Sequence, residues 1–468
     1  MPLTVRDVIS RLTVPALRNI RTALGLPKAL SAKDELVDAL TSQMLRNINH
    51  VLSRVSVADA RLISELAHNG GHFPADAFRA KYVGMRPADP RHFSAGEAPV
   101  AGLFFTRDEA RYFMPPSLVP TLKELVPKPQ AVRIEAVDSL PSELRHKNQT
   151  PRPIHVHKGS EIGLTELRGV LGSARTGKLK VTPRNRRPTG ATEKAIQGVL
   201  VGSDFDLELP PEVSEEYGRE FAAGSVRAHA WAVLVQQCGW CRPQNDKLVL
   251  TEAGAAVLAS GRPSDFRTGV FKMLDDDDFD EMNRVNHIKG QTGRAKRHTT
   301  KPSLRRKALF LSLRAWPVGK WVTVPEALRF CIASGHGFQT CRSSFDLYFS
   351  SHDYGYLVDD ESIDLQYLRV FLFETLGSLG LVDLAYVFPH FLWPEFDGLW
   401  GTDELPFCGR YDGLLYVRLN ELGAYCLSLT ETFQPASSAD RDDLRILPNH
   451  DIVLTNPHPS ASILTHML

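Results

Sequence analysis

The stretch Leu248-Val249-Leu250-Thr251-Glu252-Ala253-Gly254 recurs later in the chain as Val417-Arg418-Leu419-Asn420-Glu421-Leu422-Gly423. In both copies an apolar strand pattern leads to a Thr or Asn, the residue types favoured as helix N-caps. Each copy follows a long apolar helix pattern that ends near a glycine, over residues 226–237 and 367–379. The sequence therefore predicts an internal repeat of a helix followed by a two-stranded wing.

The same order of elements is expected around and before these copies. Helices at 165–172 and 189–200 flank a strand at 178–182. Further upstream, helices at 60–67 and 74–81 precede a hairpin formed by residues 103–106 and 111–114. A helix-turn-helix followed by a two-stranded wing is the winged-helix order. The predicted fold class is α+β, mainly α, with tandem winged-helix domains and short β-hairpin wings.

The N-terminal region predicts two short helices. Leu17, Ile20 and Leu24 line one face of the first, and Ser31 is expected to cap the second. The spacing of Leu24-Gly25-Leu26 and Lys33-x-x-Leu36-Val37 resembles the SAP helix-turn-helix motif. SAP motifs bind DNA, so the resemblance implies a contact near Ser31 and Lys33. A plain helical hairpin that packs on its neighbour is the alternative interpretation.

Three stretches resemble the non-catalytic part of bacterial proteins that carry the helicase-associated domain of the XPB type. They are Thr176–Thr182 with Arg186–Thr189, Leu248–Gly254, and the tail Leu444–Leu454. The resemblance implies several winged helices on one chain. Because the helicase ATPase motifs are absent, it does not imply motor activity.

The length of 468 residues predicts several domains rather than one core. The expected boundaries are 1–50 (SAP-like hairpin), 51–127 (winged helix), 128–162 (linker), 163–262 (winged helix), 263–303 (acidic, then basic loop), 304–430 (winged helix with insertion) and 431–468 (strand and tail). No run is long and apolar enough to span a membrane, and the N-terminus does not resemble a signal peptide. Six sparse cysteines in mostly apolar surroundings favour a reducing compartment, and we expect a cytoplasmic protein.

Two basic stretches without acidic residues interrupt a chain whose net charge is only +1. Residues 284–307 hold nine Lys or Arg, and residues 175–190 hold six. Such concentration is typical of a surface that contacts phosphates. The candidate nucleic-acid-binding residues are Lys33, Arg175, Lys178, Lys180, Arg184, Arg186, Arg187, Lys289, Arg294, Lys296, Arg297, Lys301, Arg305 and Arg306. The alternative is a solvated loop, or pairing of the second stretch with the acidic run 275–278.

Other possible chemistries have weak support in the sequence. The stretch 172–179 lacks the Ser or Thr of a P-loop and has the wrong order of helix and strand. Cys238 and Cys241 have CxxC spacing without a second ligand pair, so packed thiols are favoured over zinc. His155 and His157 lack an acidic partner at metal-site spacing and are interpreted as surface residues. We therefore expect no catalytic residues, cofactor or metal.

The leading hypothesis is a non-catalytic nucleic-acid-binding protein whose partner is double-stranded DNA. It would recruit or position a separate enzyme, such as a helicase, in DNA repair, transcription control or phage defence. One alternative is a protein-interaction scaffold built on winged helices. The other is a metal-dependent nuclease that uses the acidic residues at 275–280.

Overall fold

The computed structural model describes residues 2–89, 100–145, 150–202, 204–205, 225–285, 287–290, 296–343, 346–350, 356–357, 360–389, 408–434, 444–446 and 452–454. The fold is α+β, with many helices and small antiparallel sheets, as expected. The chain divides into two compact units, residues 1–133 with 329–337 and residues 134–328 with 338–468.

The first unit begins with a helical region and continues with a helix-rich part around a small sheet. Its elements are α1 (Val5–Ser10), α2 (Val14–Ala23), α3 (Lys33–Arg46), α4 (Ile48–Leu52), α5 (Val57–His68), β1 (His72–Pro74), α6 (Ala75–Lys81), η1 (Val100–Leu103), β2 (Thr106–Arg107), β3 (Arg111–Phe113) and α7 (Val119–Leu125). Its three strands lie in the order β1-β3-β2, all antiparallel.

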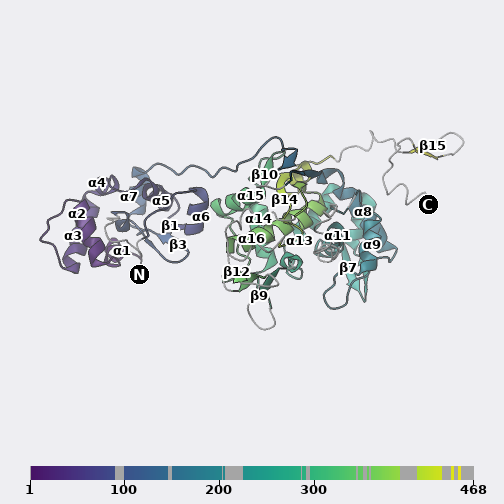
Figure 1. Ribbon diagram of the computed structural model, residues 1–468, viewed down its shortest axis with the longest axis horizontal. Helices are drawn as coiled ribbons and strands as arrows, with labels where there is room; N and C mark the ends of the chain where they lie inside the picture. The colour runs from purple at the N-terminus through teal and green to yellow at the C-terminus, as the bar shows by residue number, and fades with distance from the viewer. Residues whose placement is uncertain are drawn as a thin grey trace. The chain divides into compact units, whose positions relative to one another are not determined.

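The two helices predicted near the N-terminus are confirmed as α2 and α3 (Figure 1). Leu17, Ile20 and Leu36 are fully buried between them and their neighbours. The predicted cap is wrong by one residue, since α3 begins after Ala32 rather than Ser31. Alanine has no capping oxygen, and the Glu35 carboxylate instead accepts a hydrogen bond from the Ala32 backbone N–H at 3.3 Å.

In the second unit, helices and strands alternate in one order that occurs twice. The first copy contains α8 (Gly163–Arg175), a paired segment at 179–182, α9 (Gly190–Gln197), α11 (Arg227–Gln237), β7 (Cys241–Gln244), β8 (Lys247–Leu250) and α12 (Glu252–Ser260). An antiparallel bridge joins Lys180 to Lys247, and β8 pairs with β7. The strand that follows the first helix therefore pairs with the last strand of the hairpin.

The second copy repeats this order with insertions. It contains α14 (Pro302–Leu313), β10 (Trp321–Thr323), α15 (Val324–Ala333, whose residues from Arg329 onward belong to the first unit), α16 (Asp360–Val370), the π-helical segment η4 (Phe371–Leu376), α17 (Gly377–Leu379), β13 (Val382–Tyr386), β14 (Leu414–Leu419) and α18 (Glu421–Cys426). Again β10 pairs with β14, which lie next to each other in Figure 1, and β14 pairs with β13. The predicted internal repeat is confirmed at the level of strand pairing.

The two copies also agree in their hydrogen bonds. The Thr251 hydroxyl donates to the Gly239 carbonyl at 2.7 Å and accepts from the Gly254 N–H at 3.1 Å. The Asn420 amide donates to the Gly380 carbonyl at 2.9 Å and accepts from the Gly423 N–H at 3.0 Å. One polar side chain in each copy therefore ties the end of the hairpin to the end of the preceding helix and caps the helix that follows.

Two segments contain more regular structure than expected. The segment 263–303, expected as a loop, contains α13 (Pro263–Met273), η3 (Glu281–Arg284) and β9 (Ile288–Gly290). β9 pairs with β11 (Leu347–Ser350), which also pairs with β12 (Tyr356–Leu357).

The expected linker 128–162 contains β4 (Glu143–Leu144), β5 (Arg152–Pro153), β6 (His155–His157) and η2 (Gly159–Glu161). β6 extends the sheet of the second copy to the order β10-β14-β13-β6. In the tail, β15 (Leu444–Ile446) and β16 (Ile452–Leu454) form a separate hairpin.

Candidate polyanion interface and arginine pocket

The first basic stretch forms an ordered turn. The backbone N–H of Thr182 donates to the Arg187 carbonyl at 2.9 Å, and Val181 bridges to Pro188. Arg186 adopts a positive φ of 54°, an uncommon conformation that this closed turn imposes. We call residues 182–187 the arginine turn. Arg184 and Arg187 are exposed at its tip, and Arg186 is half-buried.

The small sheet beside this turn carries cations on one face. Lys180 lies directly opposite Lys247, and Arg242 lies opposite Val249, two residues further along β8. Because side chains alternate across a strand, Lys178, Lys180, Lys247 and Arg242 share one face, and all four are exposed. We call these four residues the basic face. The opposite face carries Leu179, Val181 and Leu248, which are buried in the core.

One carboxylate lies beside the basic face among the described residues. Asp246 is 3.3 Å from the Lys180 ammonium, and both side chains are about half exposed. A solvent-exposed pair of this kind contributes little attraction. Most of the positive charge of the basic face therefore remains uncompensated.

Three arginines of the second basic stretch are engaged inside the protein. The expectation that they contact nucleic acid is therefore wrong. Arg305 is 1% exposed and paired with Asp280, and Arg306 is 0% exposed and paired with Glu281. Arg297 donates to the backbone carbonyls of Met282 and Val285. These guanidinium groups hold the protein together and are not available to a partner.

Of the remaining candidates from this stretch, Lys301 faces the acidic run, as does the neighbouring Lys307. Lys301 is 3.9 Å from Asp277, and Lys307 is 2.5 Å from Asp275. Lys289 and Lys296 are exposed, and Arg294 lies outside the described residues. Lys33 is exposed at the start of α3, and Arg175 is exposed at the end of α8.

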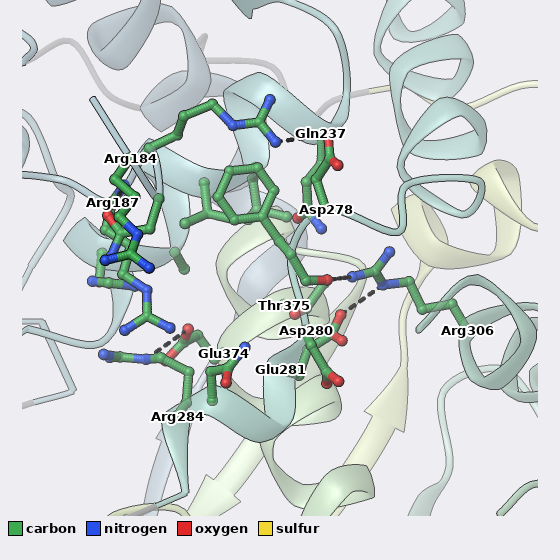
Figure 2. A pocket seen from close by; sticks show the side chains of 18 residues that line it. Arg184, Arg187, Gln237, Asp278, Asp280, Glu281, Arg284, Arg306, Glu374 and Thr375 are labelled. Atoms are coloured by element: carbon green, nitrogen blue, oxygen red, sulfur yellow. Dashed lines mark hydrogen bonds and ion pairs between the residues drawn. The ribbon is translucent and has the colours of Figure 1, made fainter. Parts of the chain in front are cut away.

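The arginine turn forms one wall of a pocket of about 390 Å³. The other walls come from α11, from residues 278–284, and from η4. Figure 2 shows Arg184 and Arg187 on one side of the pocket and Arg306 on the opposite side. The charged or polar lining residues are Arg184, Asn185, Arg186, Arg187, His229, Gln237, Asp278, Asp280, Glu281, Asn283, Arg284, Arg306, Glu374 and Thr375.

Each carboxylate in the lining has an internal cation. Asp278 pairs with Arg186 at 2.6 Å, and Glu374 accepts from Arg284 at 2.9 Å and from the Tyr411 hydroxyl. Asp280 forms an ion pair with the buried Arg305, and Glu281 forms one with the buried Arg306. In contrast, no hydrogen bond or ion pair within the described residues engages the side chains of Arg184 and Arg187.

The wall opposite the arginine turn contains a departure from regular helix. Residues 371–376 form a π-helical turn within the long helix that runs from α16 to α17, and Glu374 and Thr375 line the pocket from it. Such π-bulges are rare and occur frequently at functional sites. Sequence reasoning missed this wall. The isolated Glu374 within Phe371-Leu372-Phe373-Glu374-Thr375-Leu376 was the available signal.

The cysteines and acidic groups give no sign of a metal centre in the described part of the chain. Cys238 and Cys241 are free and buried, and burial raises the pKa of the Cys241 thiol to about 12. Within the ranges that the structure describes, no group of three or more His, Cys, Asp or Glu side chains is placed to hold a metal ion.

His157 is half-buried rather than a surface residue as expected, while His155 is exposed. Over the same described ranges, no helix combines the length and apolar character that crossing a membrane requires.

Comparison with known protein families, with curated proteins and with solved structures gives no match for this chain. The arrangement of the basic face and of the arginine pocket is therefore the basis for its functional interpretation.

Proposed function

We propose that this chain is a non-catalytic protein that holds duplex DNA by its phosphate backbone and positions a separate DNA-processing enzyme, such as a helicase. The order of helices and strands in each repeat, with the strand pairing described above, supports an assignment to the winged-helix class. In that assignment β7 and β8 are the wing, and α11 stands at the position of the recognition helix, although its side chains lie in the core.

The observation that carries the proposal is the basic face. Four cations from two separate segments of the chain lie on one face of a sheet, where strand alternation gives them a common direction. Such an arrangement self-repels unless a polyanion occupies it. Duplex DNA presents closely spaced phosphates that match such a row of cations.

Because the helices are buried, contacts to the phosphate backbone of DNA are favoured over contacts to base edges. In α11 every residue from Arg227 to Gln237 is buried except the half-buried Val233 and Gln236. The corresponding helix of the second copy is buried from Ser362 through Leu379. A helix whose side chains are engaged in the core cannot present them to base edges, so contacts to phosphates would dominate and specificity would be low. Few aromatic side chains flank the basic stretches, which disfavours a stacking platform for single strands.

A salt titration of duplex binding tests the proposal. The variant K178A/K180A/K247A removes three phosphate contacts, so log Kd against log salt should lose a slope of about 2.7. Fluorescence anisotropy with a labelled duplex measures this slope, and circular dichroism checks the fold. The matched control K289A/K301A/K307A makes the same charge change in the second basic stretch and should bind like the wild type.

Three results would reject the proposal. One is no binding of duplex by the wild type at about 50 mM salt, and another is binding that about 200 mM salt leaves unchanged. The third is an equal loss of affinity in the control variant, which would show that net charge alone determines binding.

A protein-interaction scaffold is the second candidate, and two observations favour it. The second basic stretch pairs with the acidic run instead of adding to a cationic surface. Leu304 and Leu311 are 62% and 50% exposed, one heptad apart on α14. A defined partner that is retained after nuclease treatment, and released by L304K/L311K, would support the scaffold over DNA binding.

A further inference from the structure

We infer that the pocket beside the arginine turn binds a phosphate-bearing ligand that also carries hydrogen-bond donors, which is the chemistry of a nucleotide. The site is separate from the basic face, because none of the four residues of that face lines the pocket. The inference therefore stands whether or not the chain binds duplex DNA.

The charge balance of the pocket favours an anionic ligand. Its carboxylates are neutralised from within, by Arg186 for Asp278, by Arg284 for Glu374 and by the buried arginines of α14. Arg184 and Arg187 then remain as two guanidinium groups without a partner among the described residues. They project from a turn closed by hydrogen bonds, so their backbone is preorganised. Guanidinium groups recognise phosphate through paired, charge-assisted hydrogen bonds.

A second and independent feature calls for hydrogen-bond donors on the ligand. Glu281 lines the pocket, its side chain is 8% exposed, and its Oε1 accepts from Arg306 at 2.6 Å. Its other oxygen, Oε2, is buried and has no hydrogen-bond partner among the described residues. An unpaired buried carboxylate oxygen is costly, and an N–H or O–H group of a ligand would satisfy it. Inorganic phosphate carries an O–H donor of its own at neutral pH, but a nucleotide adds the N–H and O–H groups of its base and sugar, which can reach this oxygen while the phosphate stays at the arginines.

The volume of the pocket and its π-helical wall, opposite the arginine turn, are compatible with a nucleotide. A volume of about 390 Å³ lies within the range of small-molecule sites. The π-helical turn at 371–376 presents Thr375 and the paired Glu374 to the pocket, where a regular helix would place different side chains. The ligand chemistry has two sources, a free nucleotide or the 5′-phosphorylated end of a nucleic-acid strand.

Calorimetric titration tests the inference with adenosine 5′-monophosphate, inorganic phosphate and adenosine. We expect the nucleotide to bind more tightly than phosphate, and adenosine not to bind. R184A/R187A should weaken nucleotide binding roughly tenfold or more, since charged hydrogen bonds are lost. V233W, which fills the pocket from α11, should also abolish binding. The control R175A/R242A removes two exposed cations outside the pocket and should bind normally.

Two further measurements separate the sources and separate this site from the basic face. A 5′-phosphorylated duplex that binds more tightly than its 5′-hydroxyl form, only when Arg184 and Arg187 are present, identifies a strand end. Equal binding of the two duplexes identifies a free nucleotide. K178A/K180A/K247A should keep nucleotide affinity while it loses duplex affinity. The inference is overturned if the wild type binds no nucleotide, if phosphate binds as tightly as nucleotide, or if R184A/R187A binds undiminished.

Discussion

At the scale of single residues, a buried polar cluster joins α8, α11 and β6. Glu166 and Arg227 are 0% and 1% exposed and form an ion pair, and the Trp231 indole donates to Glu166 at 2.9 Å. His157 lies near this cluster, with its ring centroid 4.8 Å from that of Phe205, and within the described part of the chain its Nε2 has no hydrogen-bond partner. Burial, aided by the positive charge of Arg227, lowers the pKa of His157 to about 3.

This histidine predicts acid sensitivity of folding. The pKa in the folded state lies below the unfolded value of about 6.5, so the unfolded chain binds the proton first as pH falls. The stability contribution of neutral His157 is therefore complete above about pH 6.5 and declines steadily toward pH 3. At pH 5 the loss should be about 2 kcal/mol.

H157F should flatten the pH dependence of the unfolding free energy between pH 7 and pH 5, since phenylalanine keeps the packing against Phe205. Urea unfolding at both pH values measures the effect. The exposed neighbour His155 provides the control, and H155F should behave like the wild type. Parallel pH profiles of H157F and the wild type would contradict the assignment.

At the scale of elements, the repeat could be predicted because its signals are local. In each copy the strand alternation leads directly into a capping Thr or Asn, and the preceding helix ends at a glycine, 12 residues before Thr251 and 40 residues before Asn420. The insertions between elements, and the addition of β6 to the sheet of the second copy, depend on contacts between distant segments. The hydrogen bond from the Gly159 N–H to Asp383, 224 residues away, is one of these.

The two helix-starting glycines make the repeat testable. A Cβ at Gly254 would lie 1.9 Å from the Trp240 carbonyl oxygen, and one at Gly423 would lie 2.0 Å from that of Leu381. G254A and G423A should each destabilise the second unit by about 1–3 kcal/mol through overpacking, despite the better helix propensity of alanine. At Gly172 in α8 an added Cβ would have no atom of the described residues within 4 Å, so G172A should instead stabilise the fold by about 0.5–1 kcal/mol. Thermal unfolding measures the stability of the three variants. A similar change of stability in all three would contradict the close contacts at Gly254 and Gly423.

At the scale of the whole molecule, the charge distribution was only partly predictable. Helical periodicity places Arg305 and Arg306 one turn before Leu309 and Phe310, on the buried face of α14. That signal was present in the sequence, but the partners of these arginines lie 25 residues away in an unrelated segment. Lys178 and Lys180 of the basic face were among the cations singled out from the sequence, whereas Arg242 and Lys247 were missed, because the common direction of the four depends on the pairing of Lys180 with Lys247.

The ion pairs of the acidic run, residues 275–278, lead to a prediction about which cations are available to contact DNA. Asp275, Asp277 and Asp278 face Lys307, Lys301 and Arg186, and their side chains are 71%, 40% and 63% exposed. Exposed pairs contribute at most about 1 kcal/mol each, so D275N/D277N/D278N should fold normally. The variant releases three cations, so duplex affinity at low salt should rise and the salt slope should steepen by up to about 2.7.

The control E109Q/E124Q/E135Q changes net charge equally at exposed sites and should leave the slope unchanged. If both variants raise affinity alike, the acidic run does not mask the second basic stretch, and long-range attraction explains the gain.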